Sequence, residues 1–160
     1  MSDSTPTTIE LLAGRTGEGK AIVERLPVSI EPNDTCRLLR SPAFAAGAAR
    51  DDVLTINRAT GQYEVVSRAG NLAVRVYGPL ARAKWVDALT AELEKLGGQL
   101  DEQSPRLRVY SIHVSCGFDA IEALMESHVT APATWQYGNV YSLDDGVTPL
   151  NWWQSILTES

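Results

Sequence analysis

The second half of the chain repeats an order of patterns that few folds accommodate: strand, helix, strand, strand, helix, strand. Residues 72–77 alternate apolar and polar side chains as a half-buried strand does. Residues 81–96 place leucines and a tryptophan at helical spacing before Gly97-Gly98 ends the pattern. The remaining four patterns occupy residues 99–103, 107–115, 118–129 and 135–141. This order predicts a ferredoxin-like βαββαβ sandwich, in which two helices cover one face of a four-stranded sheet.

The first seventy residues follow a different pattern, because short β-branched runs alternate there with glycine-containing turns. The runs occupy residues 8–13, 21–30, 35–39, 53–58 and 62–68. Five such strands predict a small barrel-like sheet, since closure removes exposed strand edges. Ser41-Pro42 before an alanine-rich run predicts one or two helical turns over residues 43–49.

We therefore predict an α+β fold with four parts along the chain. A small β-rich, barrel-like N-terminal unit spans residues 7–70 and packs on the ferredoxin-like unit, which spans residues 71–146. Residues 1–6 are predicted to be a disordered tail, and residues 147–160 a C-terminal tail with a short helix.

Composition limits where the protein works. Cys36 and Cys116 are too few for a disulfide framework, and two lone thiols are typical of a reducing compartment. No apolar stretch approaches the length of a membrane span, and residues 1–6 do not resemble a secretory signal. These features predict a cytoplasmic protein that does not bind membranes.

Charge limits the class of partner. The chain carries 14 Lys and Arg against 20 Asp and Glu, a net charge of −6, and it has no basic stripe. Because nucleic-acid binding gains affinity from clustered basic residues, we expect no nucleic-acid partner. An acidic surface attracts a basic protein partner, although mild acidity is also common in soluble proteins.

Two motifs invite a catalytic interpretation, and each has a simpler explanation. The run from Gly14 to Lys20 matches a phosphate-loop spacing, but Ala21 supplies no hydroxyl and a strand follows, so a glycine-rich hairpin turn explains it better. Cys116 lies where a strand turns into a helix, near His113, but the two residues have opposite strand parity. No spacing of His, Cys, Asp or Glu indicates a metal site. We predict no catalytic residue, no metal and no cofactor.

Candidate binding residues come from the sheet face opposite the helices and from the C-terminal aromatic residues. If Leu72, Val74 and Val76 face the helices, the other face carries Arg75, Tyr77 and His113. Aromatic and arginine side chains are the usual anchors of binding surfaces. The alternative is that Arg75, Tyr77 and His113 pack against the N-terminal unit. The full candidate set is Arg75, Tyr77, His113, Trp135, Tyr137, Trp152 and Trp153.

Several segments resemble a bacterial family of unknown function, number 4265. The resemblance rests on residues 39–44 followed by Gly47 and Asp51-Asp52-Val53, on the run from Tyr63 to Arg75, and on the helix end Leu93-x-x-Leu96-Gly97. It spans roughly residues 8–142, and Asp51 stands where the family usually has glycine. The family has no established reaction, so the resemblance implies a fold and no activity.

The leading hypothesis is a non-catalytic protein-binding protein, such as an immunity-type inhibitor of a cognate bacterial toxin with a basic toxin or effector domain as its partner. Two alternatives stay open. One is a regulatory module that binds a small molecule at the sheet face around Arg75, Tyr77 and His113. The other is a thiol-dependent enzyme centred on Cys116 and His113.

Overall fold

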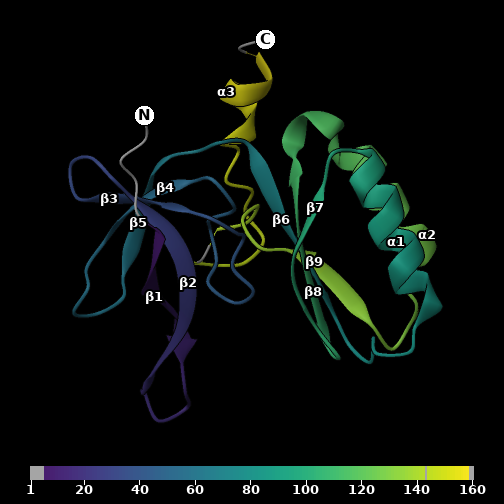
Figure 1. Cartoon of the computed structure of the whole chain (residues 1–160), viewed down its shortest axis with the longest axis horizontal. Coiled ribbons are helices and arrows are strands. Elements are labelled where there is room, and N and C mark those ends of the chain that lie inside the picture. Colours follow the sequence, from purple (N-terminus) through teal and green to yellow (C-terminus); the bar gives the residue numbers. More distant parts are fainter. Residues whose placement is uncertain (1–5, 143, 159–160) are drawn as a thin grey trace.

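Two antiparallel β-sheets lie side by side in the computed structural model, which describes residues 6–142 and 144–158 (Figure 1). The first sheet is a meander in which each strand pairs with the next along the chain. Its strands are β1 (Pro6–Arg15), β2 (Ala21–Glu31), β3 (Thr35–Leu38), β4 (Val53–Ile56) and β5 (Tyr63–Ser67). Of the tail predicted over residues 1–6, residues 1–5 lie outside the described part, and Pro6 begins β1.

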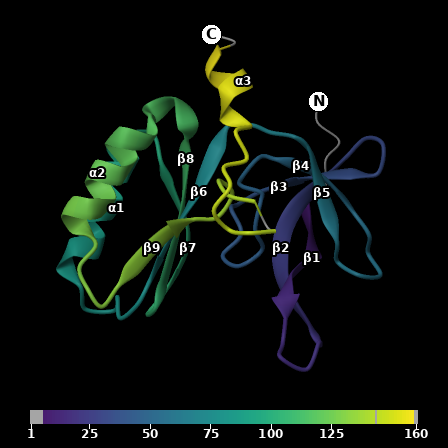
Figure 2. The same cartoon turned by 180° about the vertical axis from the view of Figure 1, so that it is seen from behind.

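The second sheet has the strand order β7-β8-β6-β9, and two helices cover one of its faces (Figure 2). Its strands are β6 (Asn71–Tyr77), β7 (Gln99–Ser104), β8 (Leu107–His113) and β9 (Thr134–Tyr137). The helices are α1 (Lys84–Lys95) and α2 (Phe118–His128), and the short 3-10 helix η1 (Val114–Cys116) precedes α2. The predicted order of strands and helices is therefore present, and the protein is a mixed α+β fold as expected.

Strand and helix periodicity explains the core of the second unit. Leu72, Val74 and Val76 alternate along β6 and are fully buried against the helices. On α1 the buried positions include Leu89 and Leu93, at the spacing of one helix face. Burial of these side chains is the main favourable contribution to the stability of this unit.

The first sheet curls around its own core without becoming a closed barrel. Leu11, Leu26, Val28, Leu38 and Leu54 are fully buried inside the curl. β1 and β5 are not paired as strands, and the two ends of the sheet meet where the Leu12 amide donates to the Gly61 carbonyl at 2.8 Å. A side chain at position 61 would place its Cβ 3.0 Å from the Leu12 nitrogen, so this contact requires glycine.

Residues 39–52, which we call the central segment, connect β3 to β4 and lie between the two sheets. The prediction of helical turns over residues 43–49 is wrong, because these residues form bends. The amides of Ala43, Phe44 and Ala45 all donate to the Glu24 carboxylate of β2, at 2.7–2.9 Å. The carboxylate supplies the acceptors that the amides of a loop need when it is buried.

The second sheet holds the central segment from the opposite side. Arg75 Nε donates to the Pro42 carbonyl at 3.1 Å, and its Nη2 donates to the Ala45 carbonyl. Asp101 of β7 has a fully buried side chain that accepts the Ser41 amide at 2.8 Å and Arg50 Nη1 at 2.9 Å. These contacts fix the two sheets to each other through one segment.

The C-terminal helix occupies only part of the tail predicted over residues 147–160. The helix α3 spans Trp153–Thr158, whereas residues 144–152 form turns and irregular backbone, with one isolated bridge between Tyr141 and Pro149. Residues 159–160 lie outside the described part.

We expect Glu24→Ala to destabilise the protein by about 3 kcal/mol, because three amides of a buried loop lose a charged acceptor. Urea unfolding followed by circular dichroism measures the change. Glu10→Ala is the matched control, since Glu10 is 55% exposed in a 3.6 Å ion pair and should contribute less than about 1 kcal/mol. Equal effects of the two substitutions would contradict the role of Glu24.

Asp52, at the end of the central segment, should make stability depend on pH. Burial raises the pKa of its carboxyl to about 6, although two backbone amides and Arg68 act in the opposite direction. A carboxyl whose pKa is raised in the folded state stabilises the protein at low pH, and that contribution is lost as pH rises through 6. We expect the free energy of unfolding of the wild type, relative to Asp52→Asn, to fall by about 2 kcal/mol between pH 4.5 and 7.5. Urea titrations of both proteins at each pH test this, and a constant difference would contradict it.

Candidate functional site

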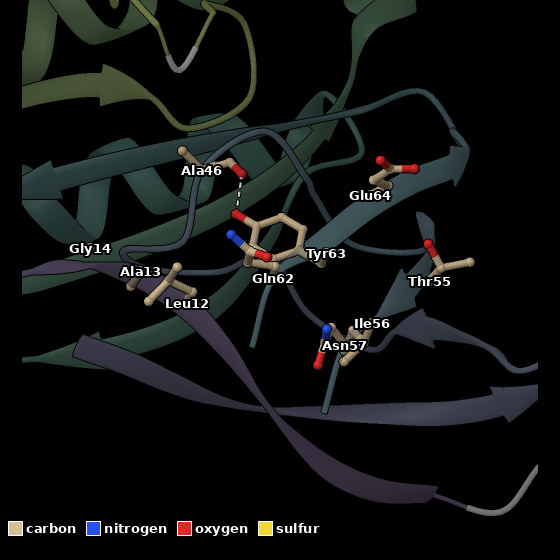
Figure 3. Close-up of a pocket in the computed structure, with 10 residues that line it drawn as sticks. All are labelled: Leu12, Ala13, Gly14, Ala46, Thr55, Ile56, Asn57, Gln62, Tyr63 and Glu64. Atoms are coloured by element: carbon tan, nitrogen blue, oxygen red, sulfur yellow. Dashed lines mark hydrogen bonds between the residues drawn. The ribbon is translucent and has the colours of Figure 1, made fainter. Parts of the chain in front are cut away.

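A cavity of about 950 Å³ opens between the two ends of the first sheet (Figure 3). One wall is the end of β1, and the other is the β4–β5 hairpin, with Ala46 of the central segment between them. Its lining residues are Leu12, Ala13, Gly14, Ala46, Thr55, Ile56, Asn57, Gln62, Tyr63 and Glu64. The volume lies at the upper end of the range of roughly 300–1,000 Å³ that is common for ligand pockets in proteins.

The backbone of the first sheet explains why this cavity exists. In an antiparallel meander of five strands, β1 and β5 run in the same direction, and each pairs on one side only. They touch through Leu12 and Gly61 and then separate, so that residues 12–14 and 62–64 bound the cavity. A bulge at Ala13 breaks the regular register of β1 at this point. Apart from the Leu12–Gly61 hydrogen bond, neither strand has a second pairing strand among the described residues, so two sheet edges flank the cavity.

The side chains of the first cavity offer hydrogen-bonding groups and one carboxylate. Tyr63 points toward Ala46 and donates its phenol proton to that carbonyl, and burial raises its pKa (Figure 3). Asn57, Gln62 and Glu64 are exposed at the cavity and offer two amides and one carboxylate. The lining contains no histidine or cysteine that could serve as a base or a nucleophile beside them.

A second cavity, of about 570 Å³, lies along the free edge of β9. Arg75 lines it, and Gln136 stands directly opposite Arg75 in the β6–β9 pairing. The other lining residues are Ala46, Glu122, Trp135, Tyr137, Gly138, Tyr141, Ser142 and Gly146. Ala46 thus contributes to both cavities.

The predicted residues of the open sheet face are in contact with the N-terminal unit, the alternative that the sequence left open. Arg75 is 3% exposed, and Tyr77 donates its hydroxyl to the Ala43 carbonyl at 3.1 Å. The ring of His113 lies against Gly70, where a Cβ would come within 2.4 Å of Nε2. Tyr77 and His113 therefore position the backbone around them, and Arg75 also lines the second cavity.

The predicted aromatic residues form one connected cluster on the helix face. Trp135 and Tyr137 stand opposite Val76 and Val74, which places them on the side of α2. Tyr137 contacts Phe118, which contacts Trp153, and Trp153 contacts Trp152, with ring centroids 5.0–5.6 Å apart. All four predicted aromatic residues are half-buried, so this cluster joins the C-terminal helix to the body of the protein.

Three contacts hold the two ends of the cluster. The indole nitrogen of Trp152 donates to the Asn139 carbonyl at 2.8 Å, and the Arg68 guanidinium lies 5.2 Å from the Trp152 ring centre. The Tyr137 hydroxyl donates to Glu122 at 3.0 Å, and burial together with this contact raises its pKa.

Cys116 and His113 are not joined by a hydrogen bond. The Cys116 thiol donates to the Leu96 carbonyl at 3.1 Å, whereas His113 Nδ1 accepts the Ser115 amide at 3.1 Å. The geometry that activates a thiol by a neighbouring imidazole is therefore not formed by these two residues. Within residues 6–142 and 144–158, no group of three or more His, Cys, Asp or Glu side chains could hold a metal ion.

Sequence reasoning missed both cavities. The first depends on the curl of the sheet, which brings β1 to the β4–β5 turn across some fifty residues of chain. The signal available in the sequence was Gly61, a glycine in the predicted turn between residues 53–58 and 62–68. A turn glycine does not reveal which distant strand it will contact.

Comparisons with known proteins agree with this two-sheet α+β architecture and identify a family. The family model described as "Domain of unknown function (DUF4265)" matches residues 24–137, and the chain belongs to that family. No curated protein matches the chain.

One solved structure with a similar fold is described as "Novel crystal structure of a hypothetical protein from Neisseria gonorrhoeae". The two chains are 14% identical and align with a TM-score of 0.67, over 84% of this chain and 94% of that one. At this identity the similarity establishes the fold alone.

The described helices are all too short or too polar to cross a membrane.

We expect Trp153→Ala to destabilise the protein by about 2 kcal/mol, because it removes ring contacts to Phe118 and Trp152 and leaves α3 weakly held. Thermal unfolding and the near-ultraviolet circular dichroism of the remaining tryptophans measure the effect. Val147→Ala serves as the control, since Val147 is 70% exposed. An unchanged melting temperature for Trp153→Ala would instead mark this residue as available for binding.

Proposed function

We propose that this protein is a non-catalytic binding protein that captures an extended segment of a protein partner at the first cavity. The observation that carries the proposal is the pair of unpaired strand edges, β1 and β5, that flank the cavity. An extended peptide supplies the backbone donors and acceptors that such edges lack, while its side chains enter the cavity. A strand added here would extend the pairing of β1 or β5.

Charge favours a basic segment in the partner. The chain has a net charge of −6, and Glu64 is the one carboxylate among the residues that line the first cavity. A lysine or arginine in the bound segment would neutralise Glu64, and the overall charge would steer a basic partner toward this protein. A basic toxin or effector domain, held by an immunity-type inhibitor, is the partner class we propose.

Phe44 supports a protein partner over a small ligand. Its side chain is 57% exposed, yet its amide is fixed by the Glu24 carboxylate at 2.8 Å. An exposed aromatic ring on a rigid backbone loses little conformational entropy on binding, which is the property of interface anchors. Two residues further along the chain, Ala46 lines the cavity. The described cysteines are both free thiols, which supports our proposal of a cytoplasmic location.

We expect Gln62→Trp, which fills the cavity, and Glu64→Arg, which reverses its charge, each to weaken partner binding at least tenfold. The tagged chain is first used to isolate its partner from a bacterial lysate at low and at moderate salt, and affinities for the purified partner are then measured by calorimetry. Glu18→Arg is the matched charge reversal, because Glu18 lies in the β1–β2 turn outside the cavity, and it should retain binding.

A photo-crosslinking residue at position 62 identifies the segment that occupies the cavity. We expect crosslinks to an extended, basic stretch of the partner and none from the same residue at position 18. Unchanged affinity of both cavity variants, or the failure of any partner to bind at either salt concentration, would refute the proposal.

A further inference from the structure

Arg75 is a buried cation with an unused donor. Its side chain leaves β6 on the face opposite the helices and is 3% exposed. Nε and Nη2 donate to the carbonyls of Pro42 and Ala45, and Nη1 has no acceptor among the described residues. Gly138 lies against the guanidinium, because a Cβ there would be 2.6 Å from Nε. Arg75 and Gly138 both line the second cavity.

No carboxylate lies within 4 Å of the Arg75 guanidinium in residues 6–142 and 144–158. None of the ion pairs found there includes Arg75. Glu24 holds the same stretch of the central segment, but its oxygens accept the amides of residues 43–45, and its ion pair is with Arg40. Burying a charged group without a partner of opposite charge is costly, so a buried and unpaired arginine at a cavity indicates a place for an anion.

We propose that the second cavity binds a small molecule through an oxyanion, a carboxylate or a phosphate, with Nη1 of Arg75 as the charged donor. Arginine suits this chemistry because its planar guanidinium donates in the geometry that carboxylate and phosphate oxygens accept. Gln136 stands opposite Arg75 on the same sheet face, and its Nε2, which donates one proton to the Tyr77 hydroxyl at 3.4 Å, carries a second. Tyr141 and Ser142 also line the cavity. A volume of about 570 Å³ accommodates a metabolite-sized ligand.

The Glu122 carboxylate could repel a bound anion, but it lies on the other face of the sheet from Arg75. It is the one acidic residue that lines the second cavity, and its carboxylate accepts the Tyr137 hydroxyl at 3.0 Å. Successive residues of a strand point to opposite faces, so Tyr137 and Glu122 lie on the helix side of β9 while Gln136 and Arg75 lie on the other. The anion would therefore meet Arg75 on the face that Glu122 does not share.

The first test is a titration of the full chain with inorganic phosphate and, separately, with succinate, at constant ionic strength against sodium chloride. We expect one of the two to raise Tm saturably, by roughly 5 °C at one hundred times its dissociation constant. Two-dimensional NMR should place the changes at the amides of Gln136 and Gly138 and at the Arg75 Nε–H. The responding probe distinguishes phosphate from carboxylate ligands. No response to either at 50 mM beyond that to chloride, or changes confined to another surface, would overturn the proposal.

Gln136→Glu provides an internal anion without disturbing the contacts that Arg75 makes with the central segment. We expect this variant to have a higher Tm than the wild type in chloride and to bind the responding probe at least tenfold more weakly. Gln136→Met is the matched control, because it keeps the side-chain length without a charge and should still respond. A Gln136→Glu variant that responds like the wild type would refute the assignment of the site. This outcome is separate from partner binding at the first cavity, which Gln136 does not line.

Discussion

The backbone of the central segment is buried between two sheets, and its polar groups must be satisfied there without forming a helix or a strand. Glu24 from the first sheet accepts three amides, and Arg75 from the second sheet donates to two carbonyls of the same stretch. The negative side chain thus binds the amides of this stretch and the positive side chain binds its carbonyls, although the two form no ion pair with each other. Because each unit supplies one of these charges, the orientation of the two sheets depends on the central segment.

The same segment determines where the two cavities lie. Ala46 lines both of them, so a single residue of the central segment forms a wall of each. Its carbonyl accepts the Tyr63 hydroxyl from the first cavity, and the carbonyl of the preceding Ala45 accepts Arg75 from the second. An anion that drew the Arg75 guanidinium toward the second cavity would act on the backbone that shapes the first. Neighbouring residues of the central segment therefore contact both proposed sites, even though different sheets provide most of the lining.

Local periodicity explains which parts of this protein can be predicted from its sequence. The alternation of Leu72, Val74 and Val76 identifies the buried face of β6, and it correctly places Arg75 on the opposite face. It cannot tell whether that face is exposed, because Arg75 is covered by residues some thirty positions away in the chain. The incorrect helix over residues 43–49 has the same origin: local propensity favours a turn of helix, and long-range contacts to Glu24 override it. The first cavity could not be predicted from the sequence, because strand patterns do not specify how far a sheet curls.

Unpaired strand edges are normally a hazard, since they can pair with other chains and cause aggregation. In this protein β1 and β5 keep such edges beside a cavity, and a hydrogen bond joins Leu12 of β1 to Gly61 in the turn before β5. One feature opposes pairing with a second copy of the chain, because Glu64 on β5 would approach like charges in an acidic protein. A basic extended segment would not meet this repulsion. Under the proposed function, this charge would disfavour pairing of the edge with the chain itself and favour a partner of opposite charge.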